Sequence, residues 1–174
     1  DKTAAMTRPK DPEPVAAQTA VRQLSSPEAT STLAARLAPW LRAGDVLLLK
    51  GAIGSGKTHF ARALIQSRLA AAGIFGNGPP PTFTLVQTYG DGATEIWHAD
   101  LYRLGDPAEI WELGLDEAMQ TGICLIEWPD RLGAAMPDDA LHLHFAPGTG
   151  DDERQLALEA RGPRGLELLA ILAP

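Results

Sequence analysis

Eight consecutive residues carry the clearest chemical pattern in this chain. The run Gly51-Ala52-Ile53-Gly54-Ser55-Gly56-Lys57-Thr58 matches the pattern G-x-x-x-x-G-K-[ST] at every fixed position. Glycines let the backbone N–H groups converge on phosphate oxygens, and a helix that follows adds its positive N-terminal end. Lys57 would then reach the β- and γ-phosphates of a nucleotide, while the Thr58 hydroxyl would bind the bridging Mg²⁺. The pattern predicts a phosphate-binding loop made of Gly51, Gly54, Ser55, Gly56, Lys57 and Thr58.

Two carboxylates follow segments that are expected to be strands. Asp100 comes directly after residues 95–99, and Glu127 comes after the apolar run 123–126. In open α/β sheets, ligands bind beyond the carboxyl ends of the strands, so both acids are catalytic candidates. Glu127 follows the more apolar strand and is expected to bind Mg²⁺, through water, or to orient the attacking water. For Glu127 the alternative is a solvated acid that caps the end of its strand, and for Asp100 it is a residue that only leads its strand into a loop.

Other polar side chains give weaker signals. Thr82 lies after a proline cluster, in a segment that could bring its hydroxyl to the γ-phosphate, as switch segments do; an ordinary strand threonine is the alternative. Ser26 and the loop 148–154 are candidates for contacts with the adenine. Packing is expected rather than metal binding for three histidines that have no cysteine or carboxylate cluster around them, His98, His142 and His144.

Composition narrows the ligand and the partner. Switch GTPases recognise guanine with the motif Asn-Lys-x-Asp. The one asparagine, Asn77, is followed by Gly78, so the expected cofactors are ATP or ADP with Mg²⁺.

A net charge of -7 and only four lysines argue against direct binding of nucleic acid and suit a basic protein partner. No apolar run is long enough to span a membrane, and no leader is visible, so a cytoplasmic location without a membrane partner is expected.

The pattern of apolar residues predicts the elements that position these groups. A strand at 46–49 precedes the loop and a helix at 58–72 follows it, with a further strand at 19–24 and a helix after Ser26. The later part of the chain is expected to form a hairpin of 82–89 with 94–100 and a helical stretch at 106–120 that is interrupted at Gly114. Strands at 123–126, 141–145 and 155–160 and a helix at 166–172 follow. We therefore predict an α/β three-layer sandwich of the P-loop NTPase type, with a mostly parallel sheet and an antiparallel hairpin. Residues 18–174 are expected to form one domain, and residues 1–17 a disordered or vector-derived tail.

Four motifs in this order resemble the bacterial TsaE (YjeE) family, small ATPases required for threonylcarbamoyladenosine in tRNA. They are the phosphate loop extended to Phe60, Pro-Thr-Phe-Thr-Leu-Val at 81–86, His-x-Asp-Leu-Tyr-Arg-Leu at 98–104 and Ile-Cys-Leu-Ile-Glu-Trp-Pro at 123–129. The resemblance implies that Thr82 is a switch threonine and that Asp100, Glu127 and Trp128 belong to the site. It also implies a slow ATPase that acts on a threonylcarbamoyl-transferase subunit and its companion, and on tRNA only indirectly. Three positions depart from the common family pattern, namely Ala52, His59 and Pro80.

Two other functions remain open at this stage. A small-molecule kinase would need an acceptor pocket and a lid that carries arginines, yet residues 106–120 contain no basic side chain. A nucleotide-gated binding module without turnover would share the phosphate loop with an ATPase, and only a measurement of hydrolysis separates the two.

Overall fold

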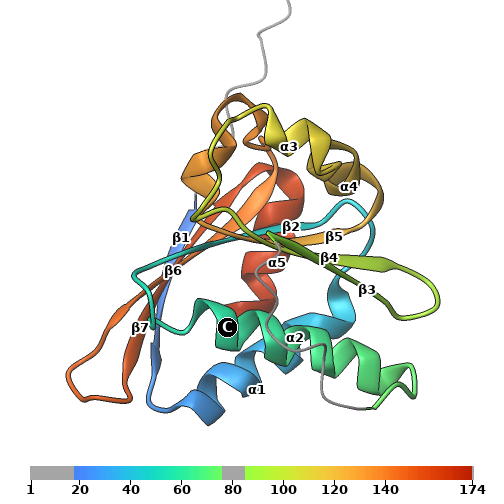
Figure 1. The fold of residues 1–174 in the computed structure, drawn as a ribbon. Coiled ribbons are helices and arrows are strands. Elements are labelled where there is room, and N and C mark those ends of the chain that lie inside the picture. Colours follow the sequence, from blue (N-terminus) through green and yellow to red (C-terminus); the bar gives the residue numbers. More distant parts are fainter. Residues whose placement is uncertain (1–17, 76–84, 174) are drawn as a thin grey trace, which may run out of the picture.

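A seven-stranded sheet runs through the molecule (Figure 1). The structure is a computed structural model that describes residues 18–75 and 85–173. The four central strands run parallel, whereas the outer pairs on both sides are antiparallel. In spatial order the strands are β1 (Gln18–Leu24), β7 (Arg154–Arg161), β6 (Ala140–Pro147), β2 (Val46–Lys50), β5 (Ile123–Glu127), β4 (Glu95–Asp100) and β3 (Val86–Gly90).

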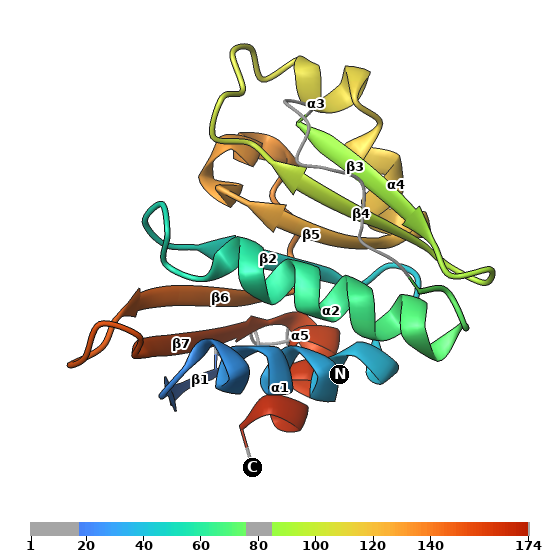
Figure 2. The same ribbon diagram turned by 60° about the horizontal axis from the view of Figure 1, so that its bottom comes forward.

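Helices cover both faces of this sheet, which confirms the predicted three-layer sandwich. One face packs against α1 (Pro27–Leu37), the short η1 (Ala38–Trp40), α2 (Lys57–Ala71) and α5 (Gly162–Leu172). The other face packs against α3 (Glu109–Glu112), α4 (Leu115–Thr121) and η2 (Pro129–Ala135). Figure 2 shows α1 and α2 side by side on the first face. Among the described residues, no helix has the length and apolar character needed to cross a membrane.

The apolar run of β2 is buried from both sides, as its sequence predicts. Leu47 and Leu49 belong to the core under α1, α2 and α5, while Val46 and Leu48 belong to the core under α3, α4 and η2. Successive side chains of a strand point to opposite faces, so a continuous run of apolar residues fills both cores. This burial fixes the strand that leads directly into the loop predicted to bind phosphate.

The far end of α2 is tied to two other parts of the fold. Arg68, in the last turns of α2, donates hydrogen bonds to the carbonyls of Ala38 at 2.8 Å and Leu41 at 3.0 Å, and pairs with Asp91 at 2.8 Å. Burial alone would raise the pKa of Asp91, but backbone N–H groups of the β3–β4 turn and the Arg68 guanidinium outweigh it and lower that pKa. These contacts fix the direction of α2, and hence the place of its N-terminal end at the edge of the sheet.

The helical stretch at 106–120 is interrupted at Gly114, as the sequence predicts, and forms two short helices on either side of this residue, whose φ is 78°. The start of the last helix differs from the prediction. Helix α5 begins at Gly162 rather than at 166, because the carboxylate of Asp139 accepts the N–H groups of Arg164 at 3.1 Å and Gly165 at 2.8 Å. This cap comes from a distant part of the chain, so the local pattern gave no sign of it. The expected tail 1–17 and the first residues of the expected strand at 82–89 lie outside the described residues.

Candidate nucleotide-binding site

The loop between β2 and α2 has a backbone that its glycines permit. Gly51 has a φ of 141°, and a Cβ placed there would lie 2.6 Å from the Phe145 carbonyl oxygen and 2.5 Å from the Ser55 Oγ. Gly56 has a φ of 110° and immediately precedes α2. In the described part of the chain no side chain caps the N-terminus of α2. Its first N–H groups therefore remain free to bind an anion.

Lys57 lies in a confined position at this helix end. Only 4% of the residue is exposed, its Nζ donates a hydrogen bond of 2.6 Å to the Gly51 carbonyl, and the same atom lies 3.9 Å from the centroid of the Trp128 ring. Burial lowers the pKa of Lys57, against the opposing effect of the negative charges on Glu127 and Asp100. A cation that has lost this much water is well suited to bind an anionic ligand.

Glu127, at the end of β5, is held through both of its carboxylate oxygens. Its Oε1 accepts a hydrogen bond of 2.8 Å from the Thr58 hydroxyl, and its Oε2 lies 2.7 Å from the His98 Nε2. Burial would raise the pKa of Glu127, but the hydrogen bonds from His98 and Thr58 and the charge of Lys57 lower it overall. The carboxylate is therefore ionised and accepts only, so the Nε2 of His98 carries the proton and donates.

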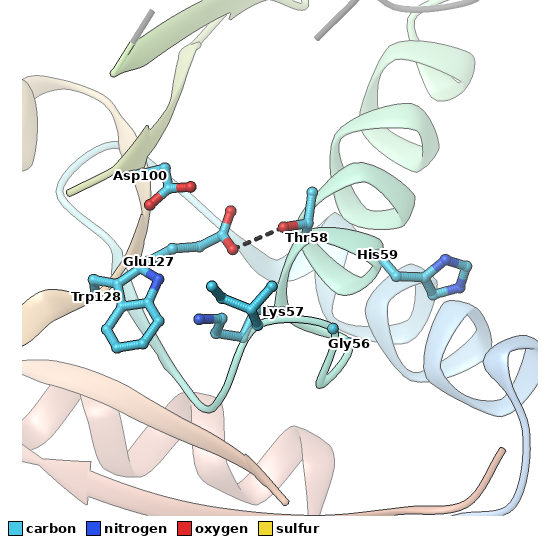
Figure 3. Close-up of a pocket in the computed structure, with 9 residues that line it drawn as sticks. Gly56, Lys57, Thr58, His59, Asp100, Glu127 and Trp128 are labelled. Carbon is cyan, nitrogen blue, oxygen red and sulfur yellow. Dashed lines mark hydrogen bonds between the residues drawn. The ribbon is translucent and has the colours of Figure 1, made fainter. Parts of the chain in front are cut away.

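These groups surround a cavity of about 260 Å³ (Figure 3). Strands β4 and β5 are paired in parallel with Asp100 opposite Glu127, which brings both acids to the same edge of the sheet. The carboxylate of Asp100 also accepts the N–H of Tyr102 at 3.1 Å, so this residue both faces the cavity and shapes its own loop. The lining residues are Ile53, Gly54, Gly56, Lys57, Thr58, His59, Asp100, Glu127 and Trp128.

Trp128 has an unusual backbone conformation. Its φ of 58° and ψ of 53° are left-handed, and it is the only residue other than glycine with positive φ in the described ranges. The ring stacks at a tilt against Tyr102, with centroids 4.8 Å apart, and lies over Lys57. A left-handed tryptophan costs of the order of 1–3 kcal/mol, and such strain is concentrated at functional sites.

Most of the residues predicted from the sequence meet at this cavity. Gly51 and Ser55 lie beside it rather than in its lining, and Thr82 lies outside the described residues. The site also contains a residue that the sequence did not assign to it, since His98 was expected only to pack and instead holds Glu127. Alternation along β4 puts His98 and Asp100 on the same face of the sheet, and this spacing is the only signal in the sequence that links the two residues.

Arg154, which ends the loop 148–154 that was a candidate for contacts with the adenine, instead contacts the phosphate loop itself. Its Nε lies 3.2 Å from the Ser55 carbonyl oxygen, although the local sequence around Arg154 gives no sign of this contact. His59, one of the departures from the family pattern, lines the cavity and lies 2.8 Å from the Ser31 Oγ and 3.0 Å from the Pro27 carbonyl. It thereby links the beginnings of α1 and α2. Ser26 caps α1 by accepting the N–H of Ala29 at 3.1 Å.

The donor groups fit a phosphate group accompanied by a hard metal ion. The Oγ of Ser55 is buried and has no hydrogen-bond partner among the described residues, although most buried hydroxyls have one. This hydroxyl, the glycine backbone, the uncapped helix end and Lys57 all suit an anion. Thr58 and Glu127 offer the oxygen ligands that Mg²⁺ prefers.

Comparison with known proteins places the chain in a family. Residues 24–156 match the family described as "Threonylcarbamoyl adenosine biosynthesis protein TsaE". The chain is 36% identical over 140 residues to the tRNA threonylcarbamoyladenosine biosynthesis protein TsaE of Bacillus subtilis, covering 80% of this chain and 84% of that one. It is 37% identical over 133 residues to the protein of the same name from Rickettsia bellii, covering 76% of this chain and 89% of the relative.

A solved structure supports the same assignment. The crystal structure of Bacillus subtilis YdiB superposes with a TM-score of 0.72 at 30% sequence identity, covering 90% of this chain and 95% of that one. Both the sequence and the fold therefore match over most of their length. This chain belongs to the TsaE family, whose members take part in the biosynthesis of threonylcarbamoyladenosine in tRNA.

Proposed function

We propose that this protein is an Mg²⁺-dependent, ATP-binding protein with slow ATPase activity that acts with a threonylcarbamoyl-transferase complex in the modification of tRNA. The observation that carries the enzymatic part is the position of Glu127, held between Thr58 and His98 directly beside the phosphate-binding loop. The names of the relatives support the part that concerns tRNA.

Binding of the nucleotide would depend mainly on the loop and on the start of α2. Lys57 and the backbone N–H groups would hold the phosphates, and the Ser55 hydroxyl would gain the partner that it lacks. The Thr58 hydroxyl and the Glu127 carboxylate would hold Mg²⁺, which neutralises charge on the β- and γ-phosphate oxygens when bound. We therefore assign the affinity for the nucleotide to the loop, and the hydrolysis of ATP to the carboxylates of Asp100 and Glu127.

Hydrolysis would use the chain's own carboxylates to orient water. Glu127 would accept a hydrogen bond from the water whose oxygen attacks the γ-phosphorus, while the bond from that phosphorus to the bridging oxygen breaks and gives ADP and phosphate. His98 keeps one carboxylate oxygen in place, so the other faces Thr58. Asp100 adds negative charge that favours the protonated form of Lys57.

The kinase alternative has less support. Segment 106–121, where a lid would be needed, contains five acidic side chains and no lysine or arginine. A kinase lid uses basic groups to stabilise the transferred phosphoryl group.

The charge of the chain bears on its partner. An acidic chain with a net charge of -7 suits a protein partner better than direct contact with tRNA. We therefore propose that the ATPase acts on the transferase subunit and its companion. It would act on tRNA only through these two proteins.

Two substitutions test the proposal. Lys57→Ala should abolish binding of ATP measured by calorimetry, whereas Glu127→Gln should still bind ATP and lose turnover by roughly 10²-fold or more. Lys50→Ala is the matched control, because Lys50 ends β2 just before the loop, pairs with Asp130 at 3.6 Å and does not line the cavity.

The assays should be run with and without Mg²⁺ and with the purified transferase subunits. Tight binding of ATP by the Lys57→Ala variant would refute the assignment of the loop. If no ATP is hydrolysed under any condition, the protein is instead a nucleotide-gated binding module. Absence of both stimulation and complex formation with the transferase subunits would refute the assigned partner.

A further inference from the structure

Arg154 connects the β6–β7 hairpin to the phosphate-binding loop. The residue opens β7, where it pairs with Leu24 of β1 on one side and Pro147 of β6 on the other. Its guanidinium donates to the carbonyls of Asp151 at 2.8 Å and Glu153 at 2.9 Å within its own hairpin. The position of the side chain is therefore set by the sheet and by the hairpin, before any contact with the loop.

The same guanidinium contacts the carbonyl oxygens of two residues in the middle of the loop. Its Nε donates to Ser55 at 3.2 Å, and an Nη donates to Gly54 in a longer contact of 3.4 Å. In Figure 2 the loop before α2 and the β6–β7 hairpin lie at the same end of the sheet. All the acceptors of these bonds are backbone carbonyls, so this arginine acts on the shape of the chain.

The planarity of the peptide bond gives this contact a consequence for the ligand. In a trans peptide the N–H points opposite to the C=O, so the N–H groups that follow Gly54 and Ser55 point away from Arg154. The first of these, that of Ser55, already bonds to the Ala52 carbonyl at 3.1 Å. The second, that of Gly56, remains available to a ligand, and Gly56 lines the cavity.

Glycines alone would not hold this orientation. Gly54 has a φ of 78°, and a Cβ added there would meet no atom within 4 Å, so packing around its Cα does not restrict this residue. Glycine populates several backbone regions at similar energy, and an untethered loop would lose entropy when it binds. The hydrogen bonds from Arg154 to the carbonyls of Gly54 and Ser55 restrict these backbone conformations before a ligand binds.

We propose that Arg154 is a positioning residue that preorganises the phosphate-binding loop for a nucleoside diphosphate or triphosphate without touching the phosphates. This inference rests on the proposed function, since it concerns the affinity of the same site. Arg154 then contributes to ground-state binding of the polyphosphate and leaves the rate of the chemical step unchanged.

Calorimetric titration of Arg154→Ala and Arg154→Lys with ADP and with inorganic pyrophosphate tests this role. Arg154→Ala should weaken the binding of both probes by a similar factor of about tenfold or more, the equivalent of one hydrogen bond to a charged group. At saturating ATP its kcat should stay within about twofold of the parent protein. Arg154→Lys should retain most of the defect, because an ammonium group keeps the charge and lacks the planar fork.

The matched control is Arg161→Ala. Arg161 closes the same strand, is exposed and contacts Glu159 at 3.1 Å, so its loss should leave both affinities unchanged. Thermal unfolding without nucleotide should show that both variants are folded at the temperature of the titrations, with the lower midpoint for Arg154→Ala because it loses four hydrogen bonds. Should Arg154→Ala fail to fold, Arg154→Gln takes its place in the same titrations.

Four results would overturn the inference. Unchanged affinity for ADP would remove the role altogether, and full recovery in Arg154→Lys would show long-range attraction between charges instead. Weaker binding of ADP with unchanged binding of pyrophosphate would show a contact with the base or ribose. A lower kcat at unchanged affinity would make Arg154 part of the reaction. If the parent protein itself bound no ADP, the proposed function would fail, and this outcome is distinct from the other four.

Discussion

Gly51→Ala is the sharpest test of how the loop is built. The new methyl group would lie 2.6 Å from the Phe145 carbonyl oxygen and 2.5 Å from the Ser55 Oγ. The hydroxyl can rotate away, but the carbonyl belongs to β6, which is hydrogen-bonded to β2 on one side and β7 on the other. The loop must therefore move, since the sheet cannot.

The expected loss of stability in Gly51→Ala has two contributions, backbone strain and steric overlap. Alanine at a φ of 141° costs about 1–3 kcal/mol of backbone strain, and forcing a methyl group into filled space costs about 1–3 kcal/mol more. Gly73→Ala is the control, because Gly73 has a φ of 78° and no atom within 4 Å of the added Cβ, so only a left-handed penalty of about 1–2 kcal/mol applies. We expect Gly51→Ala to destabilise the protein by about 2–6 kcal/mol, clearly more than Gly73→Ala.

Equilibrium unfolding in urea and titration with ADP measure the two consequences. Gly51→Ala should also weaken ADP binding by at least about tenfold, because the loop that moves contains the carbonyl bound by Lys57. Gly73→Ala should bind ADP like the parent protein. If the two variants lost equal stability and both kept full affinity, the reasoning about the close approach of Gly51 to β6 would be wrong.

Two further predictions concern single hydrogen-bonded contacts. His98→Leu removes the donor to Glu127, so turnover should fall by about 10- to 100-fold in a steady-state ATPase assay while the affinity for ADP changes little. Asp91→Asn keeps an acceptor for the turn and removes the charge beside Arg68, so it should cost about 1–3 kcal/mol in urea unfolding at pH 7. Because the pKa of Asp91 is lowered by folding, this stabilisation is present above the ordinary value of 3.8 and is lost as the pH falls below it.

Each of these two predictions has a clear control. His144→Leu changes an exposed histidine on β6 and should leave turnover unaltered; equal activity of the His98 and His144 variants would argue against the role of His98. For Asp91→Asn, the difference from the parent protein should begin to shrink as the pH falls below 3.8 and should disappear only below the lowered pKa of the folded state. A difference that did not shrink as the pH fell would show that the charge is not its source.

The loop and its flanking elements were predictable because their signals are local. Every fixed position of the motif lies within Gly51 to Thr58. The apolar runs of β2 and β5 indicate that both faces of these strands are buried. Glu127 was found in the same way, from its place at the end of such a run. The fold class followed from the alternation of strands and helices, and the structure confirms it.

Features that depend on distant pairings were not predictable from one sequence. The contact of His98 with Glu127 needs the register of β4 against β5, and the contact of Arg154 with Ser55 needs the β6–β7 hairpin to lie beside the loop. The start of α5 depends on Asp139 in the same way. Such contacts arise when separate segments meet, and no local propensity encodes them.

The order of the strands also determines when the site can exist during synthesis of the chain. Strand β2, which leads into the loop, pairs with β5 and β6, both made much later, and Gly51 lies against the backbone of β6. Strand β1 is the last strand whose partner is synthesised, because β7 lies near the opposite end of the described chain. Pairings between such distant segments form slowly. A nascent chain that ends before β6 therefore carries the complete motif without the strand against which Gly51 packs.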